Sequence, residues 1–205
     1  MIIVPGIPAV LTAATFIPEP PAVGGTVLDD FNDGNITEYS GDTGNFSAEV
    51  GSAYEGAYGL LSSILVNGGT KVISRATPAT SQTKTYSGWL RLGSTNTING
   101  FLFGFQDTSN YYRAEIQTGT ALALVKYAVG SSTPIASVAI SASAAVWYQV
   151  AVAWAAGGGM TISWSGGAET ANGTENTWST GGLGWRSTDS PIGTETCDYD
   201  YFVEA

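Results

Sequence analysis

The sequence predicts an all-β domain, a two-sheet antiparallel sandwich, with an extended N-terminal arm in front of it. Short segments from residue 26 onward alternate apolar and polar residues with the period of two that is typical of half-buried strands. Clusters of turn-forming residues separate these segments, and no stretch has the pattern of an amphipathic helix. The 205 residues are 43% hydrophobic and only 12% charged, so one chain can build a large core with a mostly neutral surface.

Residues 1–25 form the predicted arm. Residues 1–23 are apolar, but they lack a basic start and contain five prolines. Those prolines exclude a continuous helix, so we expect neither a signal peptide nor membrane insertion, and the segment should be extended with polyproline character. An apolar arm needs a surface, either its own sandwich or a neighbouring subunit. We expect a neighbouring subunit, and with it a homo-oligomer.

Residues 26–205 form the predicted sandwich, and two of its first clear strands carry polar and aromatic side chains on the face away from the core. Apolar residues alternate through residues 84–92 and again through residues 111–117, which follow a turn after three alternating phenylalanines. We expect these two strands in one sheet. Their outward residues include Trp89, Arg91, Tyr111, Arg113 and Glu115.

The clearest element is a hairpin in the second half of the chain. Residues 146–154 alternate strictly, three glycines at 157–159 turn the chain, and residues 160–164 alternate again. The glycine run is not a phosphate loop, because no lysine follows it. Further segments at 121–129, 135–140 and 197–203 bring the expected total to about twelve strands.

Charge and rare residues exclude several functions. The net charge of −10 makes nucleic acid an improbable main partner, because phosphate would be repelled. Histidine is absent, which removes the Ser-His-Asp triad and most catalytic zinc sites. Cys197 is the single cysteine, so no disulfide forms within the chain, and we expect it to be a small buried residue.

Several runs carry a resemblance to a known family. They are GWLRLGS, NGFLFGFQDTSNYYRAEIQTGTALALVKY, VWYQVAVAW, ISWSGG, GLGWRS and CDYDYFVEA, together with the opening DDFNDGNITEYSGDTGNFS. In this order they resemble the concanavalin A-like lectin and glucanase jelly roll in its laminin-G-like form, over residues 26–205. The resemblance implies a curved two-sheet sandwich, and it implies carbohydrate or protein binding more often than catalysis.

Catalysis is not expected. Glycosidases of this fold carry an E-x-D-x-x-E pattern that places an acid and a nucleophile on one strand face, and the chain has no such pattern. Glu115 stands alone on its strand with Arg113 two residues away, which favours an ion pair. We therefore expect no enzymatic activity.

The resemblance also implies a structural calcium site. Relatives take calcium oxygens from the opening D-F-x-D-G segment and from a carboxylate near the end, which here gives Asp30, Asp33, Asp198 and Asp200. The opening segment does not match an EF-hand loop, because Phe31 stands where an oxygen ligand is needed. The alternative is that Asp33 and Gly34 only form a turn. No other cofactor is expected.

Glycan binding is one hypothesis for the outward residues on these two strands. Rings of Trp89 and Tyr111 could stack on sugar faces, while Arg91, Arg113 and Glu115 could hydrogen-bond hydroxyl groups or acidic sugars. The alternative is that a loop or another subunit covers this face.

Two function classes follow from these features. The first is a non-enzymatic virion structural protein, a capsid-decorating, turret or tail component of a tailed virus of a salt-loving archaeal host. Its arm would dock on other virion subunits, and its lectin-like domain would face outward toward host glycans from the virion surface. The second is a secreted, extracellular carbohydrate-binding module or lectin. An extracellular-type domain that starts with a methionine and is not expected to carry a signal peptide favours the first, and the acidic, lysine-poor composition would suit a virus of a salt-loving host.

Overall fold

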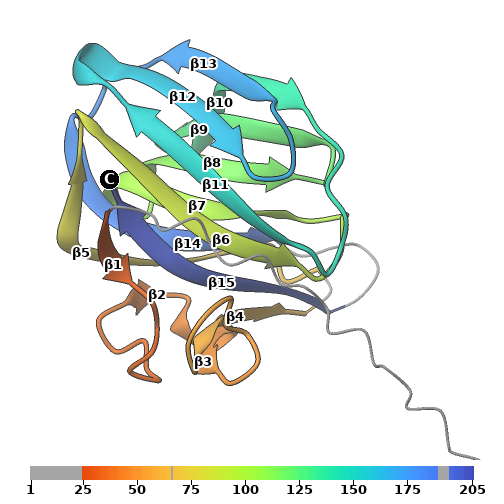
Figure 1. Cartoon of the computed structure of the whole chain (residues 1–205). Helices are drawn as coiled ribbons and strands as arrows, with labels where there is room; N and C mark the ends of the chain where they lie inside the picture. Colours follow the sequence, from red (N-terminus) through yellow and green to blue (C-terminus); the bar gives the residue numbers. More distant parts are fainter. Residues whose placement is uncertain (1–24, 66, 189–193) are drawn as a thin grey trace, which may run out of the picture.

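The computed structural model describes residues 25–65, 67–188 and 194–205 (Figure 1). Two antiparallel sheets pack face to face, which confirms the predicted all-β sandwich. The helical elements in these ranges are two three-residue 3₁₀ turns, η1 (Thr43–Asn45) and η2 (Ala156–Gly158), and no described helix has the length and hydropathy to cross a bilayer. All of the predicted arm except Gly25 lies outside the described residues, as does its predicted docking.

The first sheet has eight strands in the order β13-β12-β11-β6-β15-β4-β3, with β1 paired to β15. Its strands are β1 (Thr26–Asp29), β3 (Phe46–Glu49), β4 (Gly59–Ile64), β6 (Lys84–Leu92), β11 (Trp147–Trp154), β12 (Gly159–Trp164), β13 (Thr170–Thr174) and β15 (Glu195–Glu204). The predicted glycine hairpin is confirmed, because β11 pairs with β12 and Trp154 lies opposite Met160.

The second sheet has seven strands in the order β10-β9-β8-β7-β14-β5-β2. Its strands are β2 (Ser40–Gly41), β5 (Thr70–Ser81), β7 (Ile98–Asp107), β8 (Asn110–Gln117), β9 (Ala121–Ala128), β10 (Ser131–Ala139) and β14 (Thr180–Thr188). The described residues thus contain fifteen strands rather than about twelve. Strands as short as β2 hold too few residues to show an alternation.

The expectation that residues 84–92 and 111–117 share a sheet is wrong. β6 pairs with β11 and β15 in the eight-stranded sheet, whereas β8 pairs with β7 and β9 in the seven-stranded sheet. The chain changes sheets between β5 and β6 and again between β6 and β7. Alternation along a strand defines its two faces, but it does not say which sheet the strand joins.

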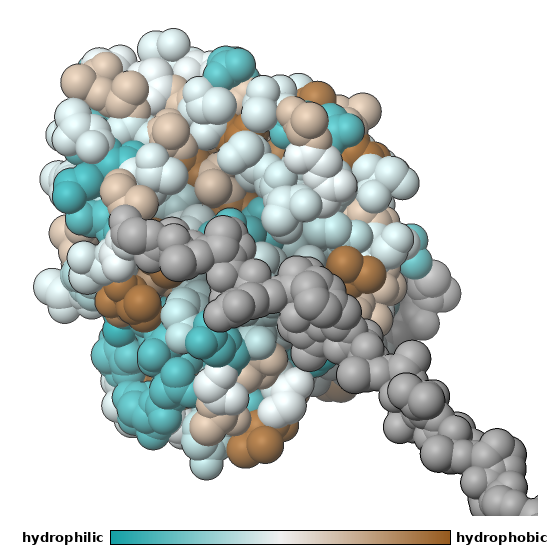
Figure 2. All heavy atoms as spheres, viewed as in Figure 1, coloured by the Kyte–Doolittle hydropathy of each residue, from teal (hydrophilic) through white to brown (hydrophobic). Residues whose placement is uncertain are grey.

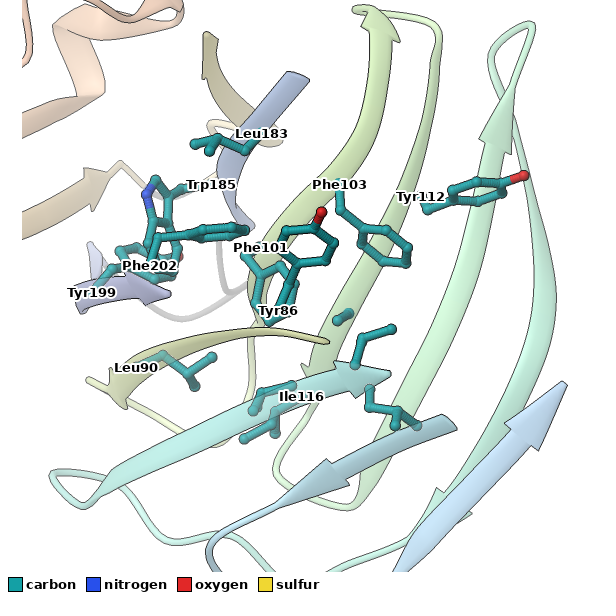
Figure 3. Close-up of a cluster of buried hydrophobic side chains, with 14 of the residues drawn as sticks. Tyr86, Leu90, Phe101, Phe103, Tyr112, Ile116, Leu183, Trp185, Tyr199 and Phe202 are labelled. Atoms are coloured by element: carbon teal, nitrogen blue, oxygen red, sulfur yellow. The ribbon is translucent and has the colours of Figure 1, made fainter. Parts of the chain in front are cut away.

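Aromatic rings from both sheets fill the core between them (Figure 3). The Trp185 indole lies 5.0 Å from the Tyr199 ring and 5.6 Å from the Phe202 ring, measured between centroids.

Cys197 is also fully buried, as predicted, and its thiol is free. On the side viewed in Figure 2, where the eight-stranded sheet is nearer, hydrophobic residues form small separate patches among neutral ones. The large apolar side chains are therefore used mainly in the interior.

A bulge at Gly104 changes the face to which β7 points its third phenylalanine. Phe101 and Phe103 belong to the core, and the pairing of β7 with β8 shifts register after Phe103. Gly104 has a φ of +57°, and a Cβ there would lie 3.0 Å from the Tyr112 ring, so both the backbone and the space favour glycine. The bulge turns Phe105 outward, where it stacks on Tyr111.

Candidate functional site

Three rings form a row on the outer face of the seven-stranded sheet. Tyr111 on β8 lies opposite Tyr127 on β9, with 5.0 Å between ring centroids, and Phe105 stacks on the other side of Tyr111 at 5.8 Å and an interplanar angle of 18°. We call Phe105, Tyr111 and Tyr127 the aromatic row. Tyr111 is buried between its neighbours, while Phe105 and Tyr127 are half-buried. The row therefore offers its two end rings to a ligand.

Two arginines beside this row share one carboxylate. Glu115 Oε2 lies 3.0 Å from Arg186 Nη1 and 3.5 Å from Arg113 Nε. We call Arg113 and Arg186 the arginine pair. Alternate residues of β8 and β14, such as Ala114 and Trp185, belong to the core, so these three charged side chains lie on the outer face of the sheet.

The missing side chain of Gly100 makes this arrangement feasible. Gly100 on β7 lies between Arg186 on β14 and Glu115 on β8 in the sheet register. A Cβ at Gly100 would come within 2.7 Å of the Glu115 Cβ and still closer to the Ala114 carbonyl oxygen. Glycine therefore lets the Arg186 side chain cross the width of β7 and reach Glu115.

The remaining contacts of the three charged groups are with neutral partners. Arg113 Nη2 donates to Ser132 Oγ at 2.9 Å, Arg186 Nη2 donates to Thr70 Oγ1 at 3.5 Å, and Glu115 Oε1 accepts from the Gln117 amide at 2.8 Å. The arginine side chains are each 7% exposed, and Glu115 is 1% exposed. Burial lowers the pKa of Arg113, an effect that Glu115 opposes and Arg186 reinforces.

The aromatic row and the arginine pair form one continuous site. The Arg113 guanidinium carbon lies 5.6 Å from the centroid of the Tyr127 ring. A ligand that stacks on Tyr127 is therefore within reach of a charged donor. Rings with nearby guanidinium groups can hold the apolar face of a sugar and its polar substituents at the same time.

The outer face of the eight-stranded sheet has a different arrangement. The Trp89 ring is covered by Tyr54 from the β3–β4 connection, with 3.8 Å between centroids and an interplanar angle of 10°. Arg91 is 32% exposed and donates to Asp198 at 2.8 Å, and its guanidinium lies 5.2 Å from the Trp147 ring. Trp147 and Tyr54 are half-buried.

The structure divides the five residues predicted to bind glycan between two faces. Tyr111, Arg113 and Glu115 lie together on the seven-stranded sheet, whereas Trp89 and Arg91 lie on the outer face of the other sheet. The ion pair expected between Arg113 and Glu115 is present. Sequence reasoning missed Phe105, Tyr127 and Arg186. Alternation would have placed Arg186 outward, since Trp185 beside it is a core residue.

No three of the four carboxylates predicted to hold calcium come together. Asp30 and Asp33 each accept a backbone N–H two residues on, as in simple Asx turns, and Asp198 is paired with Arg91. In the part of the chain that the structure describes, no three or more carboxylate, histidine or cysteine groups are placed to hold a metal ion. Local turns and an ion pair therefore account for three of these four side chains.

The fourth carboxylate, Asp200, holds the connection that covers Trp89. It is fully buried and accepts backbone N–H groups from Tyr54 at 2.7 Å, Glu55 at 3.1 Å and Tyr201 at 2.9 Å. Burial raises the pKa of Asp200 to about 7, and the three N–H donors oppose this rise. Asp30 adds a smaller repulsion in the same direction as burial.

Comparisons with known proteins show the fold. No family model matches the sequence, and no curated protein sequence is similar to it. The carbohydrate-binding module CBM66 of Bacillus subtilis superposes with a TM-score of 0.64 at 15% identity, over 83% of this chain and 96% of that one. An endo-β-1,4-glucuronan lyase of Trichoderma reesei superposes with a TM-score of 0.57 at 12% identity, over 86% of this chain and 93% of that one.

A third match is part of a longer protein. The GH43 protein BlXynB of Bacillus licheniformis superposes with a TM-score of 0.58 at 14% identity, over 86% of this chain but only 38% of that one. At these identities the likeness shows the fold alone, which is the concanavalin A-like sandwich that the sequence resemblance implies.

Proposed function

We propose that this protein binds carbohydrate through the outer face of its seven-stranded sheet and acts as a non-catalytic binding module. The observation that carries the proposal is the aromatic row beside the arginine pair. Stacked rings provide an apolar surface for a sugar ring, and guanidinium groups provide charged donors for its oxygens.

The structural comparisons support carbohydrate more than a structural role in a virion. One of the matched proteins is a carbohydrate-binding module, and two others carry the names of carbohydrate-active enzymes. We favour a binding role over catalysis because Glu115 is held in ion pairs with two arginines, whereas a glycosidase needs two carboxylates that act together. An extracellular location suits this function, and placement on a virion surface stays a prediction.

A glycan array with matched ring deletions on the two faces tests the proposal. Tyr127→Ala removes an end ring of the row, and we expect it to weaken binding by about tenfold or more, equivalent to about 1.4 kcal/mol. Trp147→Ala, the control, removes a half-buried ring from the opposite face and should leave binding unchanged. The proposal fails if no glycan binds the wild type, or if only the Trp147 variant loses binding.

A further inference from the structure

Among the residues that the structure describes, the arginine pair carries one more positive charge than its ion-pair partners neutralise. Glu115 is the one carboxylate with a described ion pair to either Arg113 or Arg186. The four other ion-paired cations of the described chain each have a carboxylate of their own, and Arg75 has two, Asp29 and Glu38. This excess of positive charge occurs in a chain whose net charge is −10.

Burial makes that unbalanced charge costly. More than nine-tenths of each arginine side chain is removed from solvent, so water supplies little compensation. A buried charge is normally paired and hydrogen-bonded, because desolvation otherwise costs several kcal/mol. An anion placed against the pair would restore the balance.

The donors of the pair also exceed the acceptors available to them. The Nε atoms of Arg113 and Arg186 are buried and have no hydrogen-bond partner among the described residues. The Arg113 Nε contact with Glu115 is a longer ion pair. Glu115 cannot supply more, because Oε2 already serves both arginines and Oε1 accepts from Gln117. Guanidinium forks match oxyanions such as carboxylate and sulfate.

We propose that the arginine pair binds the carboxylate or sulfate group of an acidic sugar whose ring stacks on the adjacent end of the aromatic row. This inference rests on the proposed function and names its ligand class. Tyr127 is the end ring in contact with the pair, because the Arg113 guanidinium carbon lies 5.6 Å from its centroid. The acidic substituent therefore points from Tyr127 toward Arg113 and Arg186.

Two oligosaccharides with the same backbone test the ligand class. β-1,4-linked oligoglucuronate and β-1,4-linked oligoglucose differ only in bearing a carboxylate or a hydroxymethyl group on each ring. Calorimetric titration of the full chain should show at least tenfold tighter binding of the oligoglucuronate. Arg186→Met should abolish that preference, and it leaves Arg113 and Glu115 as a one-to-one pair, so the variant is expected to fold. Arg91→Met on the opposite face is the control and should keep the preference.

The outcomes separate the ligand class from the proposed function. Equal or tighter binding of the neutral oligosaccharide, or a preference that survives Arg186→Met, overturns the acidic class and leaves carbohydrate binding in place. A further experiment measures the melting temperature of the protein in free glucuronate or sulfate and compares it with the melting temperature in chloride at the same ionic strength. Stabilisation lost in Arg186→Met, without oligosaccharide binding, supports the anion site but contradicts carbohydrate binding. No effect of any of these ligands overturns both.

Discussion

The outer faces of the two sheets carry similar residues, but the ratio of arginines to carboxylates differs between them. On the eight-stranded sheet, Arg91 has its own carboxylate in Asp198, and the neighbouring Trp89 is covered by Tyr54. On the seven-stranded sheet, Arg113 and Arg186 share Glu115 beside a row of rings. An arginine beside an aromatic residue therefore does not identify a binding site by itself. The two faces differ in how many arginines share a carboxylate, and that depends on strands that are far apart in the sequence.

The largest expected effect comes from removing the shared carboxylate. Glu115→Gln leaves two buried guanidinium groups without a counter-charge, so we expect the free energy of unfolding to fall by about 3–5 kcal/mol. Urea denaturation of the variant and the wild type measures this difference. A loss below about 1 kcal/mol would show that the three charges are not coupled as the distances indicate.

An intermediate effect is expected at Asp200, beneath the connection that covers Trp89. Because its pKa is raised to about 7, the folded protein holds this proton more tightly than the unfolded chain does. The stability that Asp200 contributes is full below the ordinary aspartate pKa and is lost as the pH rises from about 4 through 7. Asp200→Asn cannot titrate. The unfolding free energy of the wild type, less that of the variant, should therefore decrease by roughly 2–4 kcal/mol over this pH range. This magnitude follows because each tenfold change in proton affinity corresponds to about 1.4 kcal/mol.

Denaturation series at pH 5 and pH 8 check the sign of this effect. A difference that increases with pH would mean that the three backbone N–H donors outweigh burial and hold Asp200 ionised. The cover over Trp89 would then be tightest in alkaline rather than acidic solution.

The smallest effect is expected where an arginine has a carboxylate of its own and is itself partly exposed. Asp198→Asn removes the partner of Arg91, whose side chain is 32% exposed and can turn to water. We expect a loss of less than about 1 kcal/mol in urea denaturation. A loss as large as that of Glu115→Gln would erase the distinction between the two faces.

Much of the fold could be predicted from alternation, because the two faces of a strand follow from its own residues. The hairpin of β11 and β12 and the inward residues of β8 are examples. The sheet that a strand joins depends on partners far along the chain, so the separation of β6 from β8 could not be read from either segment. A bulge such as that at Gly104 also reverses the faces beyond it, which hid Phe105.

Only half of the candidate site could be predicted, because alternation within one strand does not show which other strands lie beside it. Tyr111, Arg113 and Glu115 lie on one strand, and local alternation places them outward together. Arg186 comes from a strand 71 residues further along the chain than Glu115, and it meets Glu115 only because Gly100 leaves room between them. The covering of Trp89 likewise depends on a connection whose position no periodic pattern encodes.

The single thiol gives the molecule an internal probe of its own opening. Cys197 lies on β15 between β4 and β6, its backbone N–H donates to Ser62 Oγ, and burial raises the pKa of its thiol well above the ordinary range. Alkylating reagents require an accessible thiolate, so they react only when the packing around this core residue opens. The labelling rate under native conditions thus reports how often the core beside β15 opens, with no engineered cysteine and no change to either outer face.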